Sequence, residues 1–352
     1  MGFTYQNISG GIRITGHSDP VPQNLIIPPE IDGKTVLEIR FDAFHNRELL
    51  SVSFPSTLLK IGGGAFSSNN LADVVIPNSV IDLEYIGFTG TRLGIFENNN
   101  LTSITLSNNI TEIPTRIFRN NLISGVTIPD TVKTIGGQAF QNNELETLNI
   151  LGSTLEAVGG SAFQNNNLTI VVLPNSLISI GNNAFGSNQI TNVSIPHGIQ
   201  ILQGFQFNQI AEITIPDSIT SIGSDAFNSN LLEEIVIPNS VTYIGNRGFA
   251  FNPLTKITIG QDVGMEFGGS GSFVGGNGAF NVDYYNIGRL ADTYTWNGTN
   301  WLDPPEPTSK FYVSLDGITN KQVKKLIFNH NGVRKEVKKL FINIDGAKHQ
   351  IM

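Results

Sequence analysis

The chain of 352 residues contains no cysteine. Disulfide frameworks, thiolate zinc sites and cysteine nucleophiles are therefore excluded as explanations of its fold or chemistry. Its apolar runs stay shorter than the roughly 18 residues that a membrane-spanning helix requires. The first ten residues also lack the basic and apolar regions of a signal peptide. We expect no membrane insertion and no signal peptide in this chain.

Charged side chains are also scarce. They make up 14% of the sequence, against roughly 25% in typical soluble domains. The net charge of −8 is unevenly divided: residues 310–352 hold nine lysines and arginines and three carboxylates, a balance of +6, which leaves −14 on residues 1–309. This asymmetry predicts two modules with different partners. The acidity of the larger module argues against a nucleic-acid partner.

One pattern is present in abundance. An apolar residue followed by proline returns mostly every 22 residues, with single steps of 20, 23, 27 and 30. A chain of repeats predicts a solenoid, in which each unit packs only on its neighbours. The apolar positions are Ile27, Phe54, Ile76, Ile128, Leu173, Ile195, Ile215 and Ile237, and Leu106 and Ile150 stand at the same step without a following proline.

Two further columns share this period. The first is a small residue followed by phenylalanine: Ala43-Phe44, Ala65-Phe66, Gly87-Phe88, Ala139-Phe140, Ala162-Phe163, Ala184-Phe185, Ala226-Phe227 and Gly248-Phe249. The second is an asparagine three residues later: Asn69, Asn121, Asn143, Asn166, Asn188, Asn230 and Asn252. An asparagine amide can bond the backbone of neighbouring turns where the coil bends; alternatively, these residues are solvated turn formers. Either role is structural.

Residues 216–237 and the residues after them illustrate one turn. Apolar residues alternate over 232–237, which predicts a short strand. Pro238 should end it, because proline donates no hydrogen bond to a sheet. Residues 241–244 predict a second extended piece before a turn at Gly245. The Phe227 ring is expected to point inward from a tight turn, with the small residue before it permitting close stacking.

The complete pattern, L-x-x-I-x-I-P-x-S-V-x-x-I-G-x-x-A-F-x-x-N, resembles the BspA-like (Treponema pallidum-type) bacterial leucine-rich repeats over roughly residues 28–260. The resemblance implies a mainly β, right-handed leucine-rich-repeat solenoid of about ten 22-residue turns. It also implies a binding role, since members are commonly cell-surface or secreted adhesion proteins. The family often carries cysteine near the position that is asparagine here. The resemblance identifies no ligand.

A solenoid needs caps, because its terminal cores would otherwise be exposed. Residues 1–27 are predicted to form an N-terminal β cap. Residues 261–303 break the period and are predicted to form a C-terminal cap. The aromatic residues expected to cover the last turn are Phe280, Tyr284, Tyr285, Tyr294 and Trp296.

A second module should follow a proline-rich linker at residues 304–309. In residues 310–352, Asp316-Gly317, Asn331-Gly332 and Asp345-Gly346 each lie between strand-like segments. Such dipeptides are strong hairpin signals, so we expect a basic β-hairpin module. Its small size predicts that it oligomerises or docks on a larger assembly. It is similar to short C-terminal repeats of phage virion and tail-associated proteins.

Patterns that carry catalysis or metal binding do not occur. There is no HExxH, phosphate-binding P-loop, GxSxG or DxDxDG motif. Glu233 and Glu234 should point to opposite faces of one strand unless a bulge intervenes, which makes them a poor acid/base pair. We therefore expect no enzymatic activity, no cofactor and no bound metal.

The stacked LxxIxI strands should form a sheet that presents the recognition surface. Its hydroxyl-rich, weakly charged side chains suit a protein or glycan on a cell surface; alternatively, this is a solvated β surface without a ligand. The residues expected to point outward are Thr102, Ser103, Glu146, Thr147, Thr169, Thr191, Asn192, Glu212, Thr214, Glu233, Glu234, Thr255 and Lys256.

Together these features predict an adhesion or receptor-recognition protein. The hairpin module and the missing leader favour a phage virion component, a tail fibre or decoration protein, with the solenoid binding the host cell. A bacterial cell-surface or secreted adhesin is the first alternative. A structural virion or decoration protein without a ligand is the second. The expected location is accordingly an extracellular particle or a bacterial surface.

Overall fold

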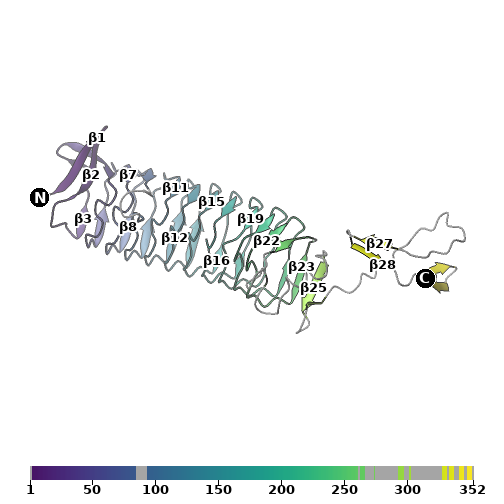
Figure 1. The fold of residues 1–352 in the computed structure, drawn as a ribbon. Helices are drawn as coiled ribbons and strands as arrows, with labels where there is room; N and C mark the ends of the chain where they lie inside the picture. Colours follow the sequence, from purple (N-terminus) through teal and green to yellow (C-terminus); the bar gives the residue numbers. More distant parts are fainter. Residues whose placement is uncertain are drawn as a thin grey trace.

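The computed structural model describes residues 2–84, 93–260, 262–265, 273, 292–296 and 301–302, and the strands of two hairpins between residues 327 and 350. The described residues up to 302 wind into a solenoid whose successive turns stack along one axis (Figure 1). Strands are short and no helix occurs in the described part of the chain. The predicted mainly β solenoid is confirmed.

The first sheet is built from the LxxIxI segments, one from each turn. Its strands pair two by two, parallel and in register, so that Ser103 lies opposite Asp73 and Thr147 opposite Gly125. Its strands are β3 (Asn24–Ile26), β6 (Ser51–Ser53), β8 (Asp73–Val75), β10 (Ser103–Thr105), β12 (Gly125–Ile128), β14 (Thr147–Ile150), β16 (Ile170–Val171), β18 (Asn192–Val193), β21 (Glu234–Val236) and β23 (Lys256–Ile259). The segment over 232–237 is thus shorter as a strand than the sequence predicts.

The second sheet is formed by the extended piece that follows each apolar-proline step. It consists of three runs of parallel strands, and the strands are mostly two residues long. They are β5 (Lys34–Ile39), β7 (Lys60–Ile61), β9 (Asp82–Leu83), β11 (Glu112–Ile113), β13 (Thr134–Ile135), β15 (Ala157–Val158), β17 (Ser179–Ile180), β19 (Ile201–Leu202), β20 (Ser221–Ile222), β22 (Tyr243–Ile244) and β24 (Gly264–Met265).

A continuous stack of phenylalanine rings runs inside the solenoid. Adjacent rings lie 5.3 to 5.7 Å apart, with interplanar angles of 3° to 20°. Its members among the described residues are Phe44, Phe66, Phe96, Phe118, Phe140, Phe163, Phe185, Phe205, Phe227, Phe249 and Phe273. One ring per turn gives about eleven turns, one more than the sequence predicts.

The stack corrects the predicted column of a small residue followed by phenylalanine. The ring that follows Phe66 is Phe96, and Phe88 lies outside the described residues. Phe96 and Phe118 are preceded by Ile95 and Ile117, which are buried. A small residue before the ring is therefore not required, because the core accommodates an isoleucine at this position in both turns.

Asparagine side chains join each turn to the one before it. Asn143 accepts a hydrogen bond from the Ile123 amide at 3.1 Å and donates to the carbonyls of Phe118 at 2.9 Å and Phe140 at 3.1 Å. Every asparagine of the predicted column is buried and donates to the carbonyl of the phenylalanine one turn earlier in the same way. Asn99 and Asn208 occupy this position in two further turns, and the predicted column did not include them.

Both ends of the solenoid are covered by antiparallel strands. At the start, β1 (Phe3–Ile8) pairs with β2 (Gly11–His17), β2 continues the second sheet through β5, and β4 (Glu30–Ile31) also pairs with β5. At the other end, β25 (Asp292–Trp296) pairs with β23 and with β26 (Trp301–Leu302).

The predicted aromatic cap residues have different outcomes. Tyr294 is buried, and Trp301, which the sequence prediction did not include, is buried as well. Phe280, Tyr284 and Tyr285 lie outside the described residues, as does the side chain of Trp296.

Of the region after residue 302, only four strands are described. The strands β27 (Ile327–His330) and β28 (Val333–Glu336) form one antiparallel pair, and β29 (Phe341–Ile344) and β30 (Ala347–Gln350) form another. The predicted linker at 304–309 and the predicted turn at 316–317 lie outside the described residues. A basic module at 310–352 remains a prediction.

Replacing Asn143 with alanine should destabilise the solenoid by about 3 kcal/mol, because buried backbone groups of two turns lose their partner. Chemical denaturation measures the free energy of unfolding. Asn149→Ala, at an exposed position of the first sheet, is the control and should change it by less than about 0.5 kcal/mol. Equal losses in both variants would contradict the structural role of Asn143.

Candidate binding surface

The outward side of the first sheet carries every residue expected for recognition. Glu212 and Thr214 belong to the same surface, in a turn whose LxxIxI segment adopts no regular strand. Twelve of the thirteen side chains are exposed and Lys256 is half-buried. We call this surface, from Asn24 to Ile259, the sheet face.

Glu233 and Glu234 do not point to opposite faces. Both side chains are exposed on the sheet face, because Glu233 lies in the bend before β21 and only Glu234 is part of the strand. Glu234 accepts a bond from Lys256 on the neighbouring strand at 2.7 Å. Both partners of this pair are well exposed, so it contributes at most about 1 kcal/mol to stability.

Several threonines of the sheet face have a second contact. The hydroxyls of Thr102 and Thr255 donate to the carbonyls of Ala72 and Glu233, one turn earlier, at 3.3 Å. Thr191 makes the equivalent contact with Thr169 at 3.5 Å. These three hydroxyls thus give the backbone carbonyls before the strands a hydrogen-bond partner. The methyl groups, and the exposed hydroxyls of the other threonines, do not have this structural role.

The sheet face also bears exposed apolar side chains that the sequence prediction omitted. They occupy the outward positions of the LxxIxI pattern, and the alternation itself could have located them. β-Branched side chains are favoured on strands. Because these side chains are 59% to 75% exposed, however, their burial adds little to the stability of the fold. These residues are Ile26, Val75, Ile170, Val172 and Val236.

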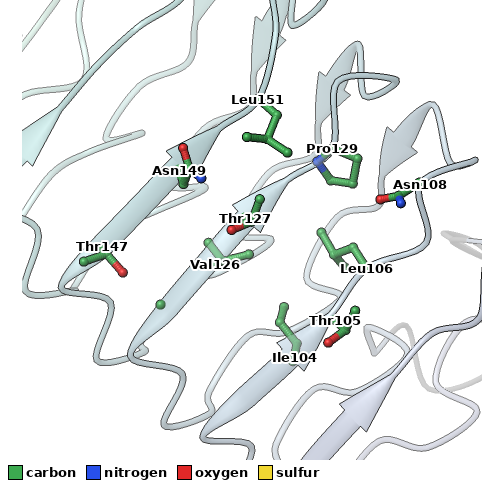
Figure 2. A pocket seen from close by; sticks show the side chains of 11 residues that line it. Ile104, Thr105, Leu106, Asn108, Val126, Thr127, Pro129, Thr147, Asn149 and Leu151 are labelled. Carbon is green, nitrogen blue, oxygen red and sulfur yellow. The ribbon is translucent and has the colours of Figure 1, made fainter.

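A shallow depression of about 370 Å³ lies where the sheet face crosses β10, β12 and β14. Figure 2 shows Ile104, Thr127, Asn149 and Leu151 around it. Gly125 on β12 lies opposite Thr147 on β14. The depression forms because Gly125 has no side chain to fill this position. A Cβ atom at Gly125 would lie 2.6 Å from the Thr147 hydroxyl oxygen. The hollow is large enough for one side chain of a partner.

Charge on the described part of the sheet face is mainly negative. Carboxylates are carried by Asp73, Glu146, Glu212, Glu233 and Glu234. The described base on this surface is Lys256, which is engaged by Glu234. The surface therefore attracts basic partners and repels acidic ones.

The chain matches the family profile described as "BspA type Leucine rich repeat region (6 copies)" over residues 37–156, 92–210 and 156–274. These matches span more than half of the chain. The protein belongs to the BspA-type leucine-rich repeat family. No match is found among curated proteins.

Three solved structures illustrate the range of similar folds. A leucine-rich cell surface protein from Faecalibacterium prausnitzii is 19% identical, with 83% of this chain and 96% of that chain covered and a TM-score of 0.39. A leucine-rich repeat protein from Bacteroides ovatus is 17% identical, with coverages of 79% and 66% and a TM-score of 0.43. The pneumococcal vaccine antigen PcpA is 16% identical, with coverages of 74% and 80% and a TM-score of 0.49.

In this chain the inward positions of the repeat are buried apolar residues in each described turn, whereas the outward positions differ from turn to turn. In this member the described residues contain no cluster of three histidine, aspartate or glutamate side chains that could hold a metal ion. They also contain no helix long and apolar enough to cross a membrane.

Val171 and Val172 allow the roles of the two sides of the first sheet to be separated. Val171 is 3% exposed and Val172 is 75% exposed. Val172→Thr should leave the free energy of unfolding unchanged within about 0.5 kcal/mol. Val171→Thr should lower it by about 1 to 3 kcal/mol, because its hydroxyl would be buried without a partner. Denaturation of both variants measures the difference, and a loss of similar size at Val172 would show that the exposed valine stabilises the fold.

Proposed function

We propose that this BspA-type protein is a non-enzymatic adhesion or recognition protein, and that its sheet face binds a protein on a cell surface. The observation that carries the proposal is the uncovered parallel sheet. All-parallel sheets usually have both faces covered by other elements of their own chain. Here the described chain covers the inner face and leaves the outer one exposed over about ten turns.

The composition of the sheet face supports a protein partner. It combines exposed valine and isoleucine side chains with threonine hydroxyls and a row of carboxylates. Apolar contacts surrounded by polar ones are the usual anatomy of protein interfaces. The carboxylates favour a partner with lysine or arginine opposite them, and disfavour sulfated or phosphorylated glycans.

A cell surface is a better-supported setting than a phage particle. Members of the BspA-type family are commonly cell-surface or secreted adhesion proteins, and the family match covers the solenoid. The phage interpretation depended on the hairpin module at residues 310–352 as well as on the missing leader, and the family matches end at residue 274, before that module. We therefore favour a bacterial surface or secreted adhesin over a virion component.

The test is a triple substitution on the sheet face. Thr147→Arg, Thr169→Arg and Thr191→Arg together place three bulky cations on exposed positions. Binding of the labelled full-length protein to a panel of bacterial and animal cells should be saturable for the unmodified chain. It should fall at least tenfold for the triple variant, because the added guanidinium groups block a face that suits basic partners.

The matched control changes the second sheet instead. Ser179, Thr220 and Thr242 are replaced with arginine in the same full-length chain. Thr220 and Thr242 donate to the carbonyls of the preceding turn, as threonines of the sheet face do. The control should keep cell binding. Equal binding by both triple variants would reject the sheet face, and no saturable binding by the unmodified chain would favour a purely structural protein.

A further inference from the structure

A second unusual surface lies on the side of the solenoid that neither sheet occupies. It is formed by the bends that contain the stacked phenylalanine rings. Two residues after each ring the backbone adopts a left-handed conformation, with φ between 54° and 58° in ten turns. The residues at this position are Asn46, Ser68, Asn98, Asn120, Asn142, Asn165, Ser187, Phe207, Ser229 and Phe251. We call this column the left-handed column.

Asparagine suits this column for two reasons. It tolerates the left-handed region better than other side chains with a Cβ atom. Its amides also bond one another between turns, since Asn120 donates to Asn98, Asn142 to Asn120 and Asn165 to Asn142, each at 2.7 Å. Phenylalanine has neither advantage.

Phe207 and Phe251 nevertheless occupy the column in the last third of the solenoid. Their side chains are 53% and 54% exposed, so burial of the rings offsets little of the conformational cost. Bulky residues held in sparsely populated backbone conformations often mark functional sites. Phenylalanine at these two positions therefore stabilises the fold less than asparagine would. This indicates that the rings are present to bind a ligand.

The surroundings of the two rings define its chemistry. From residue 187 onward, the left-handed column and the exposed positions two residues further along contain no charged side chain. These neighbours are Ser187, Gln189, Gln209, Ser229, Leu231 and Pro253. The charged residues of the same bends, Asp225 and Arg247, pair with each other at 2.9 Å. A charged ligand would therefore compete with that pair, whereas hydroxyl groups would find amides and hydroxyls that both donate and accept.

The size of the patch is small for a protein interface. Phenylalanine and leucine side chains that are about half exposed offer on the order of 100 Å² each, against about 800 Å² per partner in a stable interface. The turns around the rings are held in register by backbone bonds from Phe207 to Asn228 at 2.8 Å and from Ser229 to Ala250 at 2.9 Å. With strand-like spacing, the two rings stand about 10 Å apart.

We propose that Phe207 and Phe251, with Leu231 and Ser229 between them, form a second site that binds a neutral oligosaccharide. The flat aromatic faces stack on the C–H faces of two separate sugar units in one chain. The amides of Gln189 and Gln209 bond sugar hydroxyls beside them. This site lies on a different side of the coil from the sheet face and does not depend on the function proposed for that face.

The test replaces both rings with asparagine, which five other turns carry in the left-handed column. The full-length double variant Phe207→Asn, Phe251→Asn should keep or raise the melting temperature of the protein. The probes are cellohexaose, chitohexaose, maltohexaose and mannohexaose, with hexagalacturonate as the charged comparison. Saturation-transfer NMR and titration calorimetry should detect binding of at least one neutral probe to the unmodified chain, weakened at least tenfold in the double variant.

The control is Ile178→Asn with Ile201→Asn, which removes two apolar side chains of similar exposure, 58% and 53%, from the second sheet. It should bind the sugar as the unmodified chain does, and so should the triple arginine variant of the sheet face. The proposal is overturned if no neutral probe binds, if binding survives in the double variant, or if the double variant melts earlier. It is also overturned if sedimentation shows that the rings hold a second copy of the chain.

Discussion

The structure depends on one constraint: the backbone groups at the bend of each turn must find partners in the neighbouring turn. The buried asparagine column meets it by accepting one amide bond and donating to two carbonyls across the junction. Because the same bonds recur from turn to turn, each bend has the same shape. Uniform bends in turn bring one phenylalanine ring of each turn over the next.

Apart from threonines such as Thr102 and Thr255, which bond carbonyls of the preceding turn, the outer positions of the first sheet do not contribute to this internal packing. The inward leucine, isoleucine and valine residues are buried, and the second sheet and the ring stack complete the core. The outward positions can therefore vary between polar, charged and apolar side chains without changing the fold. The recognition that we propose for this protein depends on those positions, and the family assignment alone does not specify a partner.

Much of the fold could be predicted because its period is visible in two columns at once. The prediction went wrong at the turn between Phe66 and Phe96, where a 30-residue step offered Gly87-Phe88 as a spurious match and hid Ile95-Phe96. A rule that demanded a small residue before the ring also missed Phe118. Geometry resolves both cases, since Phe96 stacks on Phe66 at 5.6 Å and Phe118 stacks on Phe96 at 5.7 Å.

The candidate surfaces were predictable to different degrees. Alternation along the strands places the sheet-face residues outward, but a search for polar groups passed over Val172 and Val236. The bend before β21, which exposes Glu233 beside Glu234, left no clear signal in the sequence. The conformational cost of phenylalanine at positions 207 and 251 could not be predicted from the sequence, because it follows from the positive φ of these positions, which only the backbone shows.

The central claim, that the uncovered sheet face meets a protein partner, is tested most directly by photocrosslinking on intact cells. A photoreactive phenylalanine analogue is placed at Val172 on the sheet face or at Ile178 beside the second sheet, positions that are 75% and 58% exposed. The account predicts a discrete crosslinked cell protein from position 172, competed by unlabelled protein, and none from position 178. Crosslinking of the same strength from both positions, or from position 178 alone, would contradict it.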